Sequence, residues 1–256
     1  TCETHTREAT DRRANTGSCP RGSKSRYSNR GKPMEMTQQK QGLIKETRQY
    51  STGEEIANSV SHGVGVLLSI AALVLLILRA MDHKEVTHLV AALLMGISLI
   101  LEFLFSTLYH ALVPKTAKSV FRILDHSAIY LLIAGSNAPF ELITLADRGG
   151  LQLTFLIWGI AIAGVIAEVL LKERQPHWLS ALIYLAMGWF IVFRITDLYE
   201  LLAPPAFMLL VAGGICYTIG VGFYVAKKVP YLHFIWHLWV LAGAICITLS
   251  ALLYVV

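Results

Sequence analysis

The sequence predicts an all-α integral membrane protein, built as a bundle of seven transmembrane helices. Hydrophobic residues make up 55% of the 256 residues and charged residues only 15%, whereas a soluble domain usually carries about 25% charged residues. The mean hydropathy of the chain is +0.55. Apolar runs recur along the chain after residue 58, and each is close to the roughly 20 residues that a helix needs to cross a bilayer.

The N-terminal region differs from the rest of the chain in composition. Residues 1–45 are predicted to form a disordered, polar and basic tail, because they are rich in Thr, Arg, Ser and Gly and lack an apolar core. No cleavable signal peptide is therefore expected. The sequence begins without methionine, and Met34 or Met36 would be a natural start, so we expect residues 1–33 not to be native. Residues 46–256 are predicted to form the membrane domain.

Seven apolar runs joined by short loops define the expected spans of this membrane domain. They cover about 59–78, 86–109, 127–145, 151–171, 177–193, 201–226 and 231–256. Pro139 should kink the third span. Pro204 and Pro205 fit the first turn of the sixth helix, where a missing N–H is harmless.

The Lys and Arg residues predict which way the spans face. Eighteen of them lie in the tail and in the second, fourth and sixth loops, and four lie in the other loops. Because cytoplasmic loops carry the excess of basic residues, we expect the N-terminus to be cytoplasmic and the C-terminus to be outside. A multi-pass protein of this kind is expected in the cell membrane. Its basic residues flank spans and form no nucleic-acid-binding face with interleaved aromatics.

Three histidines are the strongest candidates for a functional site. His233 and His237 lie one turn apart at the start of the last span, so they share a helix face. His110 closes the second span, and the parity of the spans places all three at the same side of the membrane. Three neutral imidazoles suit Zn²⁺ and leave a fourth position for water. Such a metal lowers the pKa of its water from about 15.7 to about 7, so we predict a zinc site.

Other polar residues fall at the same depth by the same parity. Asp125 begins the third span and could hold or deprotonate the water, and Ser106, one turn before His110, could orient a substrate. Three residues spaced i, i+4 and i+8 on the first span are candidates for supporting the metal ligands: Glu54, Asn58 and His62. For any histidine taken alone, a hydrogen bond to a neighbour or snorkelling to the interface is the simpler interpretation.

These residues form a set of four motifs. They are Glu54-x3-Asn58-x3-His62, Ser106-x3-His110, Asp125 after a short basic loop, and His233-x3-His237. With these motifs, residues from about 50 to 256 resemble the hemolysin III family, the prokaryotic branch of the progestin and adipoQ receptors. The resemblance implies a seven-helix fold with the N-terminus inside and with zinc on the cytoplasmic side of the bilayer.

The resemblance also implies roles for individual residues. His110, His233 and His237 are similar in position to the family's three zinc histidines, Asp125 to its water-holding aspartate and Ser106 to its nearby serine. Receptor relatives are similar to alkaline ceramidases and are associated with ceramide hydrolysis. The founding members are named for red-cell lysis, and some relatives are linked to membrane-lipid homeostasis.

Three functions are compatible with these observations. A zinc-dependent hydrolase of an amide or ester bond in membrane lipid is favoured, because an open coordination position and an acidic neighbour suit that chemistry. A cytolytic, pore-forming protein, as the family name implies, is disfavoured because no span is strongly amphipathic with a polar face. The third function is a lipid sensor or receptor in which zinc is structural.

The expected partner is membrane lipid, and no nucleic acid is expected to bind. The sequence holds no GxSxG, Walker or GxGxxG element, so a serine-hydrolase, nucleotide-binding or dinucleotide-binding function has no motif to support it. The sequence does not predict an oligomeric state.

Overall fold

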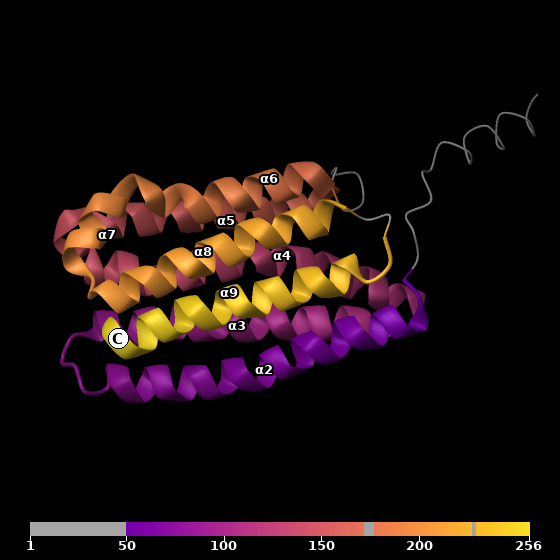
Figure 1. The fold of residues 1–256 in the computed structure, drawn as a ribbon, viewed down its shortest axis with the longest axis horizontal. Coiled ribbons are helices and arrows are strands. Elements are labelled where there is room, and N and C mark those ends of the chain that lie inside the picture. The colour runs from indigo at the N-terminus through magenta and orange to yellow at the C-terminus, as the bar shows by residue number, and fades with distance from the viewer. Residues whose placement is uncertain (1–49, 172–176, 227–228) are drawn as a thin grey trace, which may run out of the picture. The chain divides into compact units, whose positions relative to one another are not determined.

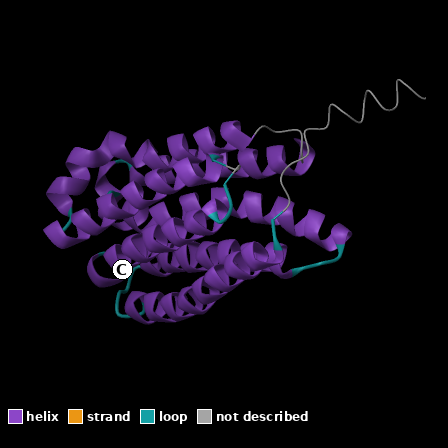
Figure 2. Cartoon of the chain, turned by 45° about the vertical axis from the view of Figure 1, so that its right-hand side comes forward, coloured by secondary structure: helices purple, strands orange, loops and turns teal. Residues whose placement is uncertain are grey.

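A computed structural model describes residues 50–171, 177–226 and 229–256 of the chain. Every regular element within these ranges is a helix, as Figure 2 shows. The predicted all-α class is therefore confirmed for this part of the chain. The predicted tail over residues 1–45 lies outside the described ranges.

The α-helices lie side by side, as Figure 1 shows. Their bounds are α2 Thr52–Ala80, α3 Val86–Ala111, α4 Lys115–Pro139, α5 Gly150–Leu171, α6 His177–Gly188, α7 Ile195–Leu201, α8 Pro204–Val225 and α9 Leu232–Tyr254. Short stretches of other helix types join some of them: the π-helix η1 Phe140–Thr144 and the 3₁₀-helices η2 Ala146–Arg148 and η4 Trp189–Arg194.

Six stretches of the described chain are long and apolar enough to cross a membrane. Five coincide with α2, α3, α5, α8 and α9, and the sixth, Trp178–Leu201, runs through α6, η4 and α7. The chain is therefore a multi-pass membrane protein. The expected third span, 127–145, falls on α4 and η1. α4 is not among the six, and its first half carries Lys115, Lys118, Arg122 and Asp125. A count of seven spans stays a prediction.

The local sequence accounts for several helix boundaries. At the start of α2, the Ser51 hydroxyl accepts from the backbone N–H of Glu54 at 3.3 Å, and the Glu54 carboxylate accepts from the Ser51 N–H at 2.9 Å, which is a capping box. Pro204 and Pro205 lie in the first turn of α8, as predicted. Where the sequence predicts a kink at Pro139, the α-helical pattern gives way to the wider π-helix, because proline supplies no backbone donor.

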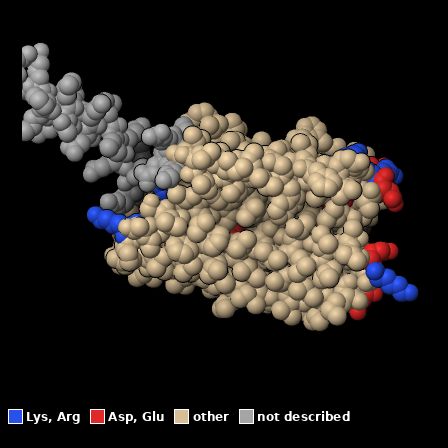
Figure 3. All heavy atoms as spheres, turned by 180° about the vertical axis from the view of Figure 1, so that it is seen from behind, with Lys and Arg blue, Asp and Glu red and all other residues tan. Residues whose placement is uncertain are grey.

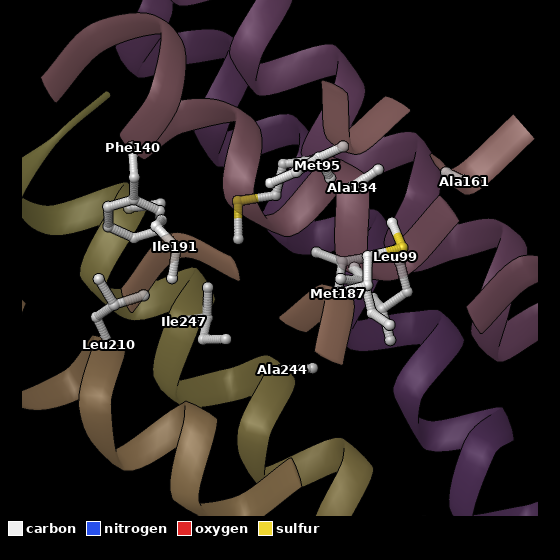
Figure 4. Packing of buried hydrophobic residues seen from close by; sticks show 14 of the residues in the cluster. Met95, Leu99, Ala134, Phe140, Ala161, Met187, Ile191, Leu210, Ala244 and Ile247 are labelled. Carbon is white, nitrogen blue, oxygen red and sulfur yellow. The ribbon is translucent and has the colours of Figure 1, made fainter. Parts of the chain in front are cut away.

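The helices enclose a core of aliphatic and aromatic side chains, part of which Figure 4 shows. α4 lies at its centre, in contact with α3, α5, α6 and α9, and Ala128, Tyr130 and Ala134 of this helix are fully buried. An added Cβ at Gly135 would lie 2.1 Å from the Ser98 hydroxyl oxygen of α3. The two helices therefore pack this closely because that position carries no side chain.

The surface divides into polar ends and an apolar wall. On the face that Figure 3 shows, Lys, Arg, Asp and Glu side chains gather at the two ends, and the wall between them carries almost none. Large apolar side chains such as Leu67, Phe155 and Met208 are exposed. Soluble proteins rarely expose contiguous apolar surface of this extent, so the wall is the surface that faces lipid.

Candidate metal centre

Three histidines meet where the end of α3 approaches the start of α9. This end of the helices also contains the starts of α2 and α4, and we call it the histidine end. His110 lies in the last turn of α3, and His233 and His237 lie in the first two turns of α9. One ligand atom of each lies within 4.8 Å of the other two, and the Nε2 atoms of His233 and His237 are 3.2 Å apart. These three side chains could together hold a metal ion.

Two of the three rings turn their Nδ1 atoms toward acceptors. Nδ1 of His237 lies 3.2 Å from the backbone carbonyl oxygen of Asn58, and Nδ1 of His110 lies 2.6 Å from Oε2 of Glu55. Carbonyl and carboxylate oxygens accept, so in each neutral ring the proton lies on Nδ1 and Nε2 keeps its lone pair. Nε2 of His110 is buried without a hydrogen-bond partner. A metal ion between the rings would account for that nitrogen.

Two of the three supporting residues expected on the first span lie against these histidines. Asn58 is fully buried, with its carbonyl oxygen at His237 and its amide nitrogen 3.4 Å from Nδ1 of His110. The His62 ring stacks on His237, with ring centroids 3.7 Å apart and an interplanar angle of 18°. Phe103 meets His62 edge-on at 5.0 Å. α2 therefore forms the wall behind the α9 histidines.

The third expected supporting residue, Glu54, acts on the backbone at the starts of two helices. Its Oε1 accepts from the N–H of Tyr231 at 2.8 Å, and its Oε2 accepts from the N–H of Ser51. Tyr231 is the N-cap of α9 and has a left-handed backbone, with φ 61°, a conformation that costs energy outside glycine. Glu54 thus holds the residue from which α9 starts, two positions before His233.

Asp125 and Ser106 also reach the histidine end from separate helices. Both are buried, Asp125 in α4 and Ser106 one turn before His110 in α3. The Ser106 hydroxyl group lies close to the Asp125 carboxyl group, which also interacts electrostatically with His110. Glu102, one further turn along α3, is buried and interacts electrostatically with Asp125. A line of polar side chains therefore leads from the histidines into the bundle.

Sequence reasoning missed Glu55, the carboxylate in contact with a metal-ligand candidate. Its Oε2 lies 2.6 Å from Nδ1 of His110 and its Oε1 lies 2.5 Å from Nζ of Lys118. The available signal was the i, i+3 spacing of Glu55 and Asn58, which places two side chains on one helix face as well as i, i+4 does. Glu54 lies four residues before Asn58 and Glu55 lies three residues before it, so both share a helix face with Asn58. The sequence alone does not show which of the two glutamates contacts a histidine.

Tyr50 is the second residue that the sequence reasoning missed. Its ring stacks on His233 with centroids 5.0 Å apart and an interplanar angle of 22°, and it meets His110 edge-on at 5.8 Å. Burial raises the pKa of the Tyr50 hydroxyl well above its usual value, so the phenol stays protonated. It immediately precedes the N-cap of α2, and the sequence carries no motif that would mark it.

A cavity lies between the helices, lined by Glu102 of α3, Trp236 of α9 and Leu198 of α7 among others. The space outside the protein atoms there is about 960 Å³ when the part open to the surroundings is included. Side chains of α4, α6, η4, α8 and α9 line it, and they are mostly apolar. Ser136 and Asn137 also line it. Because Glu102 interacts with Asp125 as well, the cavity adjoins the polar residues beside the histidines.

Comparisons with known proteins bear on the same part of the chain. A family profile described as "Haemolysin-III related" matches residues 50–248. "Hemolysin-3" of Bacillus cereus is 46% identical over 79% of this chain and 92% of its own length. "Hemolysin-3 homolog" of Bacillus subtilis is 41% identical over 81% of this chain and 97% of its own length. The human "Monocyte to macrophage differentiation factor" is 29% identical over 75% of this chain and 80% of its own length.

Proposed function

The chain belongs to the hemolysin III family, and from that premise we propose that it is a zinc-dependent hydrolase of an amide or ester bond in membrane lipid. One observation carries the proposal. Three histidines with converging nitrogens lie near the buried Asp125 and Ser106, and an apolar cavity is lined by Glu102, which interacts electrostatically with Asp125. Metal ligands, a carboxylate and an apolar binding space are the parts that such a reaction needs.

The membrane placement belongs to the same proposal. α4 continued by η1 is the span that brings the count from six to seven, and it is the third in chain order. The N-terminus is cytoplasmic, because eighteen Lys and Arg residues fall on that side and four on the other. The histidine end then faces the cytoplasm of a protein in the cell membrane. Lys115 and Lys118 at the start of α4 lie at this end, as the excess of positive charge requires.

The residues present fit a zinc ion. His110, His233 and His237 would hold it through nitrogen, a ligand set with three protein ligands that suits catalytic zinc. When bound, zinc supplies a Lewis acid that polarises a carbonyl group and makes water acidic enough to react at neutral pH.

The chain's own residues supply proton transfer, orientation of the carboxylate and binding of the acyl chain. Asp125 accepts a proton from the attacking water, and the Ser106 hydroxyl group, close to that carboxylate, fixes its orientation. The apolar cavity binds the acyl chain and keeps bulk water from the reacting carbonyl. Glu102 lines the cavity and interacts electrostatically with Asp125.

Two other functions are kept as outcomes of the test. The name "Hemolysin-3" of the Bacillus cereus relative supports a cytolytic protein, but a cavity with a mostly apolar lining gives ions and water no favourable path. A lipid sensor with structural zinc would use the same three histidines and the same cavity without needing a carboxylate beside them.

The experiment uses the full chain purified in detergent without chelator. Its zinc content is measured, and fatty-acid release is followed from N-acyl sphingoid lipids and from O-acyl glycerolipids. We expect about one zinc per chain and release of fatty acid. Asp125→Asn should keep the zinc and lose turnover by about 10²–10⁴-fold, since general-base catalysis is typically worth that much.

The matched control is Asp197→Asn, which removes a carboxylate that pairs with Arg148 and Arg194 in another part of the chain. It should leave turnover unchanged. Zinc without any fatty-acid release would reject the hydrolase in favour of the sensor. Leakage of lipid vesicles on adding the protein, with no release of fatty acid, would favour the cytolytic function.

A further inference from the structure

The carboxylate of Glu55 joins three helices at the histidine end. Glu55 lies in the first turn of α2, His110 in the last turn of α3 and Lys118 in the first turn of α4. Each carboxylate oxygen has its own partner, with Oε2 at 2.6 Å from Nδ1 of His110 and Oε1 at 2.5 Å from Nζ of Lys118.

This contact determines which nitrogen of His110 is free. A carboxylate accepts but does not donate, so His110 carries its proton on Nδ1 and presents the lone pair of Nε2. Nε2 is the buried nitrogen without a hydrogen-bond partner, and it belongs to the group of three histidines. The ammonium group of Lys118 favours the ionised form of Glu55 and restrains the carboxylate from the other side.

We propose that Glu55 is a positioning residue for the metal ligand His110, fixing its tautomer and ring orientation, and that Lys118 holds Glu55 in place. The inference rests on the proposed function, because it assumes that the three histidines hold a metal. It goes further in assigning a role to a carboxylate that touches neither substrate nor metal. A carboxylate behind a ligating imidazole also raises the ring's basicity, and its loss typically weakens metal binding by about 10–100-fold.

An ordinary ion pair between helix ends makes different predictions. The Glu55 side chain is 19% exposed and that of Lys118 30%, and a pair so close to solvent contributes little to stability. If Glu55 served only that pair, its replacement would leave both the metal affinity and the tautomer of His110 unchanged. The two interpretations are therefore separated by measurements on His110 and on the metal.

The first measurement is the affinity of the full chain for Zn²⁺, by competition with a chromophoric chelator in detergent. Glu55→Gln keeps the side-chain size and an acceptor oxygen but removes the charge, and we expect affinity about 10–100-fold weaker. Lys118→Met leaves the carboxylate in place, so its loss of affinity should be smaller. Glu200→Gln, the same substitution at an exposed position of α7, should bind Zn²⁺ like the unsubstituted protein.

The second measurement needs no metal. Nitrogen-15 NMR of the metal-free protein reports which ring nitrogen of His110 is protonated, and we expect Nδ1–H in the unsubstituted protein and a mixture of tautomers in Glu55→Gln. If Glu55→Gln does not fold, Lys118→Met carries the test through both readouts. Unchanged affinity and unchanged tautomer in these variants would overturn the inference while leaving the metal site intact. Failure of the unsubstituted protein to bind Zn²⁺ would instead overturn the proposed function and this inference with it.

Discussion

Histidines stack in pairs at both ends of the helices, and the two pairs differ in their surroundings. His83, in the connection between α2 and α3, and His88, in the first turn of α3, have ring centroids 4.0 Å apart and an interplanar angle of 7°. Glu85 lies 3.6 Å from His88. At the histidine end, His62 and His237 stack at 3.7 Å and 18°. Stacked imidazoles with a carboxylate nearby therefore occur at both ends.

The difference lies in burial and in where the chain segments come from. His83 is exposed and the Glu85 side chain is 72% exposed, whereas His88 is buried at 8% exposure. These residues are close neighbours in the sequence. His62 and His237 are each 1% exposed and belong to the first and last described helices. The comparison shows that proximity of histidines is not enough. A candidate site needs segments that converge from a distance, acceptors for Nδ1 and exclusion of water from Nε2.

The largest expected effect separates the two pairs directly. His237→Ala and His233→Ala should reduce bound zinc from about one per chain to near zero, because two remaining nitrogens cannot complete a ligand set of three. His88→Ala should leave the zinc content unchanged. Elemental analysis of protein purified without chelator measures it. Equal zinc in all of these proteins would mean that the metal binds elsewhere.

A topology experiment tests which end faces the cytoplasm. A reporter that is active only outside the cytoplasm should be active when fused after Val256 and silent when fused at Lys118, since the basic residues predict opposite sides for these positions. The orientation predicted for the histidine end depends on this result. The reverse pattern of activity would put the candidate site on the outer side and the pair of His83 and His88 inside.

Ser98 and Ser106 lie in different halves of α3 and have different neighbours, and their replacement should have different but smaller effects on turnover. Ser106 lies close to the carboxyl group of Asp125 in another helix, whereas Ser98 donates to the carbonyl oxygen of Leu94 in its own helix at 2.6 Å. Ser106→Ala should lower lipid turnover by about tenfold, the value of one hydrogen bond to a charged group near 1.4 kcal/mol. Ser98→Ala should lower it little. Comparable turnover in the two variants would show that Ser106 does not orient the carboxylate.

The smallest expected effect concerns the aromatic cover over the histidine end. Tyr50→Ala removes the ring stacked on His233 and should weaken zinc binding by about 2–10-fold, in line with the roughly 0.5–1.5 kcal/mol of an aromatic pair. Tyr50→Phe keeps the ring and should bind zinc normally. Chelator competition measures both variants. A loss in Tyr50→Phe equal to that in Tyr50→Ala would assign the effect to the hydroxyl.

Much of the fold followed from hydropathy alone, and the departures have physical causes. The all-helical membrane fold is confirmed, because runs of apolar residues near the bilayer thickness leave the backbone few alternatives to a helix. The expected third span starts at residue 127, whereas α4 starts at Lys115, since a hydropathy count excludes charged turns that a helix readily contains. Pro139 marks where the α-helical pattern ends, but the sequence predicts only a kink there and not the π-helix that follows.

The candidate site was likewise predictable from the sequence only in part. Spacing and parity suffice to bring His110, His233 and His237 to one end of the helices, because span order decides depth and i, i+4 spacing decides the face. Which of the two glutamates meets His110 depends on the rotation of α2 about its axis. That rotation follows from the capping box at Ser51 and from tertiary packing, so Glu55 becomes identifiable only in three dimensions. The metal identity and the roles of Asp125 and Ser106 stay predictions.

The order of the ligands along the chain has a consequence for how the protein is made. His110 emerges from the ribosome more than a hundred residues before His233 and His237, and these two belong to the final helix. If the three histidines hold a metal as proposed, a chain that stops short of α9 has one of the three nitrogens and cannot retain the ion. Metal occupancy would then report that α9 has been made and inserted, and products truncated before α9 would be recognised by their lack of metal.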